Sequence, residues 1–518
     1  MIALVIIGIA YILQESFLST TLNDYYWHYK VGEWIIKNKS IPTSGIFSWY
    51  ALKENLYWFS HEWLSAVLIY IISFNNPIKS IIVTKILCII FFLVCLFITR
   101  TKVKDKWLTY IIYSFFLVSI FEAYFYPRPH IFSYFLLFGV LFLLYNFIKT
   151  ENAKFLIGLP IISILWANIH GGSSNLVYIL QIFFLISTLF DFTFEKIEFT
   201  KISRRSSLYL LMSTIVSTLC LIINPHGYKI LAYPFENMQN EFMMKVIVEW
   251  ASPDIKTFSG LYYIIPIVIV GISLITTTKK IKCYDLLMFL FFAYMYFRSE
   301  RFITLFLISS IFYFYEYAPT TTTKFIEQAN IKIKMPIYAF ISTFAICYLT
   351  LAFITAFENK EISIKDNYIS QEALPIIKAL DEDGMYNHYN LGGELIYNDI
   401  NVFIDGRADM YSTYNFEDFY TLSKDSLNEH SESQAKKLIE KYNLTSFICV
   451  KTENLNLYLQ NNKDKYELVY EDENINIYID KEYYKDKMFL FSLSKINLLY
   501  ETTDSEKLVF EKIKTTLW

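Results

Sequence analysis

Long apolar segments separated by polar connectors fill the first 358 residues of the chain. A bilayer core of about 30 Å needs about 20 apolar residues per helix. The pattern therefore predicts a polytopic α-helical membrane domain over residues 1–358, with about 11 spans in a range of about 11 to 13. The first segment lacks a basic leader and a cleavage site, so we interpret it as a retained span. The expected spans are 1–19, 79–99, 107–125, 130–148, 155–169, 172–193, 207–223, 260–277, 283–297, 302–317 and 335–357.

Lysine and arginine gather in alternate connectors, at 100–106, 149–154, 196–205, 279–282 and 324–334. The positive-inside rule places these connectors in the cytoplasm. The N-terminus is then inside and the C-terminus outside, and the first outward loop covers about residues 20–78. Its apolar part, 63–74, is too short to span, so we expect it to lie on or dip into the outer leaflet.

The tail changes character after about residue 358. It predicts a helix at 371–381, strands at 385–389 and 402–405, a helix at 432–442, and strands at 446–451, 466–470 and 475–479. Helices alternating with short strands indicate an extracytoplasmic α/β domain over residues 359–518.

Composition supports the membrane assignment. The chain is 54% hydrophobic and 18% charged, with a mean hydropathy of +0.34. A net charge of -3 without a basic patch argues against a nucleic-acid partner. The six cysteines follow no paired spacing, which predicts neither a disulfide framework nor a zinc site.

The first outward loop carries the best candidate chemistry. Asp24 and His28 lie near its start among aromatic residues, and His61 and Glu62 lie near its end. An outward carboxylate can deprotonate an acceptor hydroxyl or hold a divalent cation, so Asp24, Glu62 and His28 are the catalytic candidates. The alternative is that Asp24 caps a helix over 25–38 and the aromatic side chains form an interfacial belt.

Other outward connectors carry groups suited to phosphate. Arginine presents a planar fork to phosphate oxygens, and imidazole can donate a hydrogen bond to them. The alternatives are snorkelling, pairing with Glu122 or Glu300, and ordinary structural histidines. The candidate phosphate ligands are Arg301, Arg298, Arg128, His170 and His226.

The tail motif Asp405-Gly406-Arg407-Ala408-Asp409 has a simpler interpretation. An Asp-Gly turn with a local Asp–Arg pair explains it without a function.

The order of these motifs resembles the GT-C class of glycosyltransferases, and more narrowly the bacterial relatives of the protein O-mannosyltransferase and aminoarabinose transferase group. Elements such as Pro-Arg-Pro-His, Trp-Ala-Asn-x-His-Gly-Gly, Asn-Pro-His-Gly and Asp-Gly-Arg-Ala-Asp occur here in the order expected. Two departures stand out. Tyr25 follows Asp24 where protein mannosyltransferases have glutamate, and Trp63 follows Glu62 where the aminoarabinose group has lysine.

The resemblance implies an inverting transfer of a sugar from a polyprenyl-phosphate donor to a glycan, lipid or protein acceptor outside the cytoplasm. Asp24 would act as the base or as a metal-linked carboxylate, and the cofactor would be a divalent cation, Mg or Mn. The implied location is the inner or plasma membrane. The candidate acceptor- or sugar-binding residues are Trp27, His61, Trp166, Asn168, Glu249 and Trp250.

Three other functions stay open at this point. A polysaccharide polymerase or ligase would also use a lipid-linked oligosaccharide, but usually has its main outward loop late in the chain. A lipid or sugar transporter would have polar residues at mid-membrane and broken helices in two corresponding halves. A non-enzymatic scaffold would tolerate Asp24→Asn.

Overall fold

A computed structural model describes residues 23–74, 77–99, 113–117, 119–121, 124–125, 127–247, 250–319, 368–411, 416–423 and 429–487. The chain divides into two compact units. The first, here called the helical unit, comprises Met1–Thr20, Val31–Ile41 and Ser60–Lys365. The second, the α/β unit, comprises Thr21–Lys30, Pro42–Phe59 and Asp366–Trp518. The expected boundary at 358/359 lies outside the described residues.

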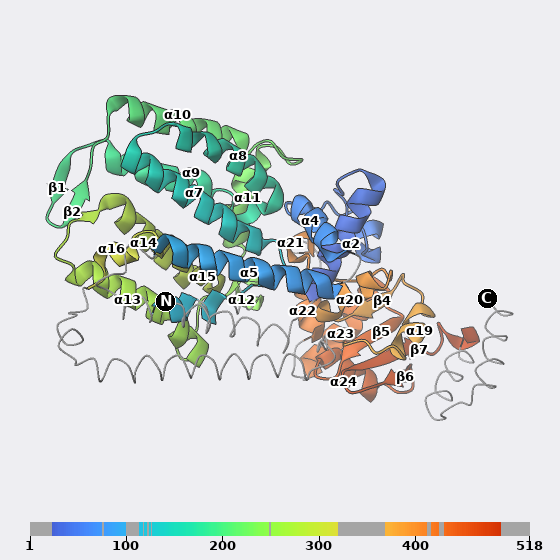
Figure 1. Ribbon diagram of the computed structural model, residues 1–518. Coiled ribbons are helices and arrows are strands. Elements are labelled where there is room, and N and C mark those ends of the chain that lie inside the picture. The colour runs from blue at the N-terminus through green and yellow to red at the C-terminus, as the bar shows by residue number, and fades with distance from the viewer. Residues whose placement is uncertain are drawn as a thin grey trace, which may run out of the picture. The chain divides into compact units, whose positions relative to one another are not determined.

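Apolar helices build the helical unit, and Figure 1 shows α7 to α10 running side by side. Helix α8 packs against α7 and α10, while α14 packs against α9 and α15. The helices are α4 (Trp63–Ser73), α5 (Pro77–Thr99), α7 (His130–Thr150), α8 (Lys154–Ile169), α9 (Leu176–Thr188), α10 (Arg204–Cys220), α11 (Lys229–Gln239), α12 (Glu241–Val246), α13 (Phe258–Thr276), α14 (Cys283–Arg298), α15 (Ile303–Ser310) and α16 (Phe314–Tyr317), with 3-10 turns η2 (Gly171–Ser173) and η4 (Glu300–Phe302).

The helical unit is a membrane domain. Among the described residues, His130–Thr150, Gly171–Thr188 and Phe258–Thr276 are long and apolar enough to cross a bilayer. Helix α10 has the polarity expected in lipid, because its small hydroxyl residues face inward and its large apolar residues face outward. Ser217 is 0% exposed, for example, whereas Leu219 is 59% exposed.

Several expected spans are helices at nearly the expected bounds, while others differ. The span at 172–193 is wrong at its end, because α9 stops at Thr188 and residues 192–194 form a strand. The span at 302–317 is broken between α15 and α16. The spans at 1–19 and 335–357, and much of 107–125, lie outside the described residues, so the number of spans stays a prediction.

A small sheet that the pattern did not predict lies among the basic connectors. Strands β1 (Phe192–Phe194) and β2 (Ile197–Phe199) form an antiparallel hairpin, and β3 (Ile281–Lys282) pairs parallel with β2. Lys282 reaches Glu198 at 2.7 Å across this sheet. The hairpin joins two connectors that the charge pattern had treated separately.

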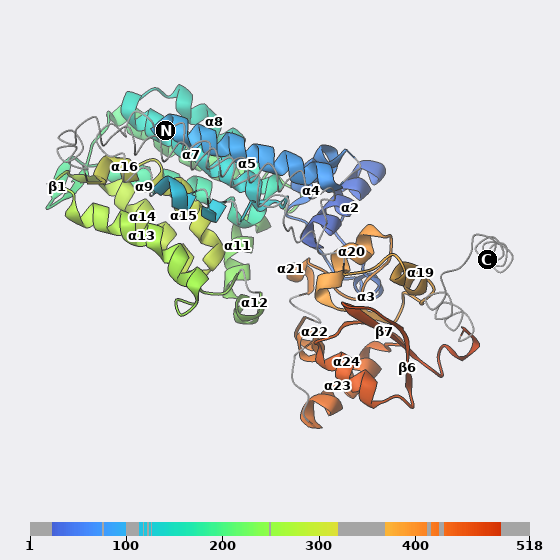
Figure 2. The ribbon, with the colours of Figure 1, turned by 60° about the horizontal axis from the view of Figure 1, so that its bottom comes forward.

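The α/β unit is built on a four-stranded sheet in the order β4-β5-β7-β6. Strands β4 and β5 are parallel, and β7 pairs antiparallel with β5 and with β6. Figures 1 and 2 show α23 and α24 on one side of the sheet and α20 on the other. The elements are α19 (Ala373–Lys378), β4 (Met385–Asn387), α20 (Gly392–Tyr397), α21 (Ala408–Tyr411), α22 (Phe416–Ser423), α23 (Glu429–Tyr442), β5 (Ser446–Val450), α24 (Asn454–Asn461), β6 (Tyr466–Glu471) and β7 (Ile475–Asp480).

This sheet confirms the predicted α/β tail, with one correction. The strand expected at 402–405 does not join the sheet; instead Val402 forms an isolated parallel bridge with Ser48. The pattern missed α20, α22 and α24. The described cysteines, Cys88, Cys95, Cys220, Cys283 and Cys449, are free thiols, and Cys347 lies outside the described residues.

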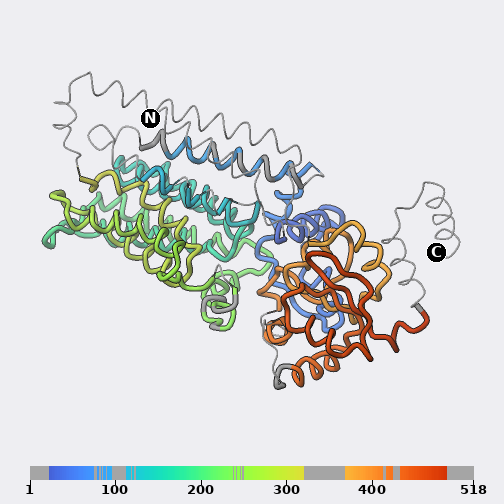
Figure 3. Tube along the Cα trace, turned by 90° about the horizontal axis from the view of Figure 1, so that it is seen from below, coloured from blue at the N-terminus to red at the C-terminus, as the bar shows by residue number. Residues whose placement is uncertain are grey.

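The middle of the first outward loop belongs to the α/β unit. Figure 3 shows this blue segment, residues 42–59, within the orange and red trace of the tail. Trp49, in α3 (Trp49–Lys53), is buried, and its indole N–H donates to the Met385 carbonyl at 2.9 Å. Its backbone N–H donates to the Val402 carbonyl at 3.1 Å. A buried tryptophan therefore ties the loop to the sheet.

Helix α2 (Asn23–Asn38) confirms the helix expected at 25–38. Asp24 lies in its first turn, where a carboxylate is favourable to the helix dipole. The first half of α2 belongs to the α/β unit and the second half to the helical unit. In the helical unit, Gly32 lets α2 approach α4, because a Cβ at Gly32 would clash with the Ala66 backbone.

Candidate functional site

Two histidines and a glutamate meet at the ends of helices in the helical unit. His61 Nε2 and His170 Nε2 each lie 3.4 Å from a Glu62 carboxylate oxygen. The three ligand atoms all lie within 4.8 Å of one another, and the side chains are partly exposed, at 13%, 19% and 16% for His61, Glu62 and His170. We call this group the His–Glu–His cluster. It combines half of the first-loop motif with the Trp-Ala-Asn-x-His-Gly-Gly motif.

Backbone contacts bring these distant segments together. His61 and Glu62 form the turn before α4, and His170 ends α8. The backbone N–H of Gly171 donates to the His61 carbonyl at 3.2 Å. A Cβ on Gly171 would clash with Ile230 of α11, so the absence of a side chain there permits the close approach.

Hydroxyl groups hold the other side of the His170 ring. Ser133 Oγ lies 2.7 Å and Ser173 Oγ 3.0 Å from His170 Nδ1. The buried Trp166 indole N–H donates to both hydroxyls, each at 3.0 Å. These contacts fix the ring so that Nε2 faces Glu62. Trp166 is fully buried, and the sugar contact predicted for it stays a prediction.

Burial keeps the imidazole of His170 neutral. The pKa of His170 is lowered to about 3, chiefly by removal from water; the charge of Glu62 raises it, and the charges of His61, Arg301 and His130 lower it. His226 behaves alike, since burial lowers its pKa to about 4. Neutral imidazole is the form that binds metals.

Arg301 is a predicted phosphate ligand whose charge acts on His170 of the cluster. The Arg301 guanidinium stacks on the Trp250 ring, with Cζ 5.0 Å from the ring centre. The backbone N–H of Glu300 donates to the Ala251 carbonyl at 3.1 Å, which joins the two segments. Burial raises the pKa of Glu300. The face of the Trp250 ring thus helps to hold the arginine beside the cluster.

Two further residues flank His61. The Tyr233 ring lies 4.4 Å from the His61 ring, centre to centre. A hydrogen bond joins His226 to the Ser60 backbone and raises the pKa of His226, whereas the charge of His61 lowers that pKa. His226, predicted from its Asn-Pro-His-Gly motif, therefore lies beside the His–Glu–His cluster.

The cluster fits a metal ion. Two imidazole nitrogens and one carboxylate are a ligand set that suits Zn²⁺ and other transition metals better than Mg²⁺. A Cβ on Gly172 would lie 3.7 Å from His61 Nε2 and 3.9 Å from His170 Nε2, so the glycine keeps the space beside both nitrogens open. The sequence had suggested Asp24 as a metal ligand, and Asp24 is not part of this cluster.

The proton position on His170 distinguishes two states of the cluster. Without a metal, Nε2–H would donate to Glu62 and Nδ1 would accept from Ser133. With a metal on Nε2, Nδ1–H would donate to the serine hydroxyls, which is the outer-shell arrangement common to metal-binding histidines. The observed contacts serve both tautomers.

Asp24, Trp27 and His28 lie in the α/β unit. The Trp27 indole N–H donates weakly to Asp24 Oδ1, at 3.4 Å. Trp27 and His28 are buried, with their rings in contact, whereas Asp24 is half-buried. The catalytic part predicted for Asp24 and His28 and the sugar contact predicted for Trp27 stay predictions.

The remaining predicted residues are placed as follows. Arg298 is exposed at the end of α14, and Arg128 is half-buried just before α7. Asn168 is fixed structurally, because its amide accepts from the Trp63 indole at 2.9 Å and donates to the Ile164 and Ile223 carbonyls at 2.8 Å. Glu249 and Glu122 lie outside the described residues.

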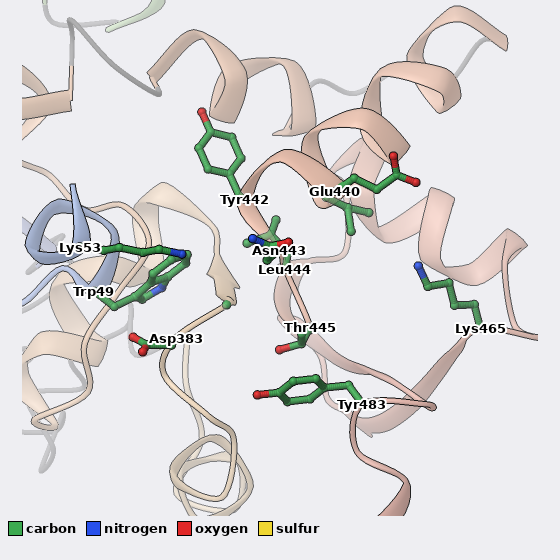
Figure 4. Close-up of a pocket in the computed structure, with 12 residues that line it drawn as sticks. Trp49, Lys53, Asp383, Glu440, Tyr442, Asn443, Leu444, Thr445, Lys465 and Tyr483 are labelled. Atoms are coloured by element: carbon green, nitrogen blue, oxygen red, sulfur yellow. The ribbon is translucent and has the colours of Figure 1, made fainter.

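A separate groove of about 460 Å³ opens in the α/β unit. Figure 4 shows Lys53 and Trp49 of α3 on one wall and the end of α23 with Thr445 on another. Its lining mixes charged and aromatic groups, and Tyr483 is 54% exposed. None of the predicted site residues lines this groove.

No protein-family model and no curated protein matches the chain. Among solved structures, the oligosaccharyltransferase of Archaeoglobus fulgidus in the apo form matches with a TM-score of 0.50 and 12% identity, covering 86% of this chain and 69% of that one. The complex of that enzyme with a tethered acceptor peptide matches with a TM-score of 0.49 and 13% identity, covering 86% of this chain and 68% of that one. Its complex with an inhibitory peptide and a dolichol-phosphate matches with a TM-score of 0.48 and 12% identity, covering 86% of this chain and 69% of that one.

The fold resembles that of an archaeal oligosaccharyltransferase. The match to the apo structure supports the GT-C fold that the sequence resemblance implies. The narrower resemblance to the mannosyltransferase and aminoarabinose transferase group stays a prediction.

Sequence reasoning missed the residues that support the cluster. Ser133 lies in an apolar segment with no local signal, and Ser173 follows the Gly-Gly pair without a motif of its own. Tyr233 was one aromatic residue among many. Only the spacing of Ser133, one helical turn after His130, offered a clue.

Proposed function

We propose that this protein transfers a sugar or oligosaccharide from a polyprenyl-linked phosphate donor to an acceptor outside the cytoplasm. One observation carries the proposal: the half-buried His–Glu–His cluster lies within electrostatic reach of Arg301, at the ends of apolar helices. The likeness of the fold to an oligosaccharyltransferase supports the same reaction class.

The residues of the helical unit suit recognition of a lipid phosphate. Arg301 lies over the Trp250 ring, and its planar guanidinium is the group suited to bidentate contact with phosphate oxygens. Neutral His226 adds a hydrogen-bond donor without adding charge. A leaving phosphate would gain stabilisation from these groups because the site is partly withdrawn from water.

His61, Glu62 and His170 would hold a divalent ion, which when bound would neutralise charge on the donor phosphate. Ser133 and Ser173 would orient His170 toward that ion. Asp24 is the residue we assign to accept the proton of the acceptor group, as the family resemblance implies, and transfer at the sugar carbon would invert its configuration.

The α/β unit offers a place for the acceptor. The groove between α3 and the end of α23 is lined by Lys53, Lys465, Asp383 and Glu440, with Trp49 and Tyr483. Aromatic rings and charges of both signs suit a polar polymer such as a glycan or a peptide. We assign this groove to the acceptor strand beyond the reacting group.

The test measures donor binding and turnover by the full chain in lipid nanodiscs. Mono- and oligosaccharides on polyprenyl phosphate and diphosphate serve as donors. Glu62→Gln and Arg301→Ala are compared with Glu198→Gln, which removes a carboxylate of the β1–β2 hairpin. We expect Glu62→Gln to lower turnover at least about 100-fold, Arg301→Ala to weaken donor binding, and Glu198→Gln to change neither.

Turnover of oligosaccharide donors alone would identify the block-transfer form of the reaction. If no donor binds, and Glu62→Gln and Arg301→Ala behave like Glu198→Gln, the glycosyltransferase proposal is wrong. The likeness would then concern the fold alone.

A further inference from the structure

The Asp405–Asp409 motif forms a rigid turn in the α/β unit. Arg407 donates to both Asp405 oxygens, through Nε at 2.8 Å and Nη2 at 2.6 Å. Tyr411 donates to Asp405 Oδ2 at 2.6 Å, and the Arg407 backbone N–H donates to Oδ1 at 3.0 Å. Asp405 and Arg407 have side chains that are 0% exposed. A bidentate pair without solvent access fixes the backbone between the two residues, which is Gly406.

Gly406 lies directly against Asp24. A Cβ on Gly406 would lie closer to Asp24 Oδ1 than van der Waals contact allows, 2.7 Å from Trp27 Nε1 and 3.2 Å from Trp27 Cδ1. Both residues would have to move to admit a methyl group. The Gly406 carbonyl accepts from the Tyr389 hydroxyl at 3.3 Å, so the turn itself is held from the other side.

Tryptophan side chains close the arrangement around the carboxylate. The Trp27 ring lies 6.3 Å from the Trp58 ring, edge to face. Arg407 Cζ lies 4.9 Å from the centre of the Trp58 ring. Asp24 is therefore linked through Trp27 and Trp58 to the same Arg407 that fixes Gly406.

The first half of α2 is also attached elsewhere in the α/β unit. Asn23 Oδ1 accepts from the Gly393 backbone N–H at 3.2 Å, and a Cβ on Gly393 would clash with the Asn23 carbonyl. Lys30 pairs with Asp399 at 2.5 Å. The helix start is thus held on two sides, and its remaining freedom near Asp24 is limited by Gly406.

We propose that Gly406, held by the Asp405–Arg407 pair, is a positioning residue that sets the place of the Asp24 carboxylate. The inference rests on the proposed function, in which Asp24 accepts the acceptor proton. It gives the tail motif a part in the reaction, whereas the sequence had favoured a merely structural turn. It also means that the α/β unit shapes the environment of Asp24 in addition to offering an acceptor groove.

The experiment compares Gly406→Ala with Gly45→Ala in the full chain in nanodiscs. Gly45 is the matched control, because a Cβ there would also be crowded in the α/β unit, against Ala51 and 2.9 Å from Met410 Sδ, but not against Asp24. Carboxyl footprinting with mass spectrometry measures the reactivity of Asp24 directly. We expect several-fold altered labelling of Asp24 in Gly406→Ala and unchanged labelling in Gly45→Ala.

Turnover then tests the catalytic consequence. A carboxylate displaced by about 1 Å costs about 100-fold in rate, so Gly406→Ala should lower kcat about 100-fold with donor Kd unchanged. Gly406→Ala combined with Asp24→Asn should be no slower than Asp24→Asn alone, since the glycine acts through the carboxylate.

The outcomes separate the two hypotheses. Unaltered Asp24 labelling in Gly406→Ala, or equal effects of the two glycine variants, overturns the positioning inference. Altered labelling without any loss of turnover leaves Gly406 as the residue that sets the carboxylate and removes Asp24 from the proposed reaction.

Discussion

The helical unit and the α/β unit bury ionisable groups in different ways. In the helical unit, His61, Glu62 and His170 are partly exposed and stand 3.4 Å apart, which is too long for tight hydrogen bonds. In the α/β unit, Asp405 and Arg407 are fully buried and bonded at 2.6 to 2.8 Å. A loose, accessible group leaves room for a ligand, whereas a closed pair fixes the backbone.

The surrounding residues differ in the same sense. The helical unit presents apolar side chains outward and serines inward, as α10 does with Leu219 and Ser217. The α/β unit has an apolar core around β5 and β7, with charged pairs such as Lys451–Glu471 at its surface. Lipid favours the first arrangement and water the second, so one chain follows opposite rules in its two parts.

Breaking the closed pair should have the largest effect. Arg407→Met leaves Asp405 as a buried carboxylate without its partner, which costs about 3–5 kcal/mol. We expect the α/β unit to unfold at much lower denaturant, as measured by hydrogen exchange of β4 to β7. Lys451→Met, which breaks an exposed pair, should cost about 0–1 kcal/mol. Similar losses of unfolding free energy in Arg407→Met and Lys451→Met would contradict the distinction between the buried and the exposed pair.

Loosening the support of the open cluster should have a smaller effect. Ser133→Ala removes a hydroxyl that orients His170, and loss of such a partner weakens metal binding about 10–100-fold. Equilibrium dialysis with Zn²⁺ and Mn²⁺ measures the affinity. Ser163→Ala is the control, because the Ser163 hydroxyl donates only to the Leu159 carbonyl of its own helix, at 3.0 Å. Equal affinities in wild type and both variants would show that the Ser133 hydroxyl does not support metal binding, and no binding in wild type would show that the cluster is structural.

The units should also respond oppositely to pH. Burial raises the pKa of Glu453 in the α/β unit to about 8, so the folded state holds a proton that the unfolded state loses near its ordinary value of 4.5. The protonated Glu453 carboxyl therefore contributes its full share of the folding stability below about pH 4.5, and that share is lost as the pH rises to about 8. His170 and His226 have lowered pKa values, so they destabilise the helical unit as pH falls below about 6.5.

Hydrogen exchange between pH 5 and 8, corrected for intrinsic rates, tests this contrast. His388 in the α/β unit, whose burial lowers its pKa to about 4, acts against Glu453, so the decisive quantity is a difference between variants. Glu453→Gln should flatten the pH dependence of the α/β unit, while Glu471→Gln on its surface should not. An unchanged slope in Glu453→Gln would show that this carboxyl is ionised in the folded state.

The smallest effect concerns packing within the helical unit. The Ser213 hydroxyl of α10 donates to the Gln181 side chain of α9 at 3.0 Å. Hydrogen bonds between membrane helices contribute about 0.6 kcal/mol on average. Ser213→Ala should therefore lower the thermal unfolding midpoint only slightly, with Ser207→Ala on the same helix as reference. If Ser213→Ala lost as much stability as Arg407→Met, the proposed difference between the two units would be wrong.

Several elements could be read from local pattern alone. Helices α7, α8 and α13 match their expected spans closely, because long apolar runs have few alternatives to a membrane helix. The pairing of β6 with β7 follows from two alternating segments joined by a short turn. The pattern did not predict the hairpin at 192–199, because the aromatic residues of the hairpin continue the apolar run of α9.

The sequence by itself determined the membrane character of the first part, the α/β nature of the tail and the motifs that bear chemistry. These depend on composition, period and residue type over short stretches. The tertiary structure alone decided which motifs meet: Glu62 with His61 and His170 in one unit, and Asp24 with Gly406 in the other. It also showed Ser133 behind His170. Such partners lie tens to hundreds of residues apart, and only the packing of side chains and the space left by glycines bring them together.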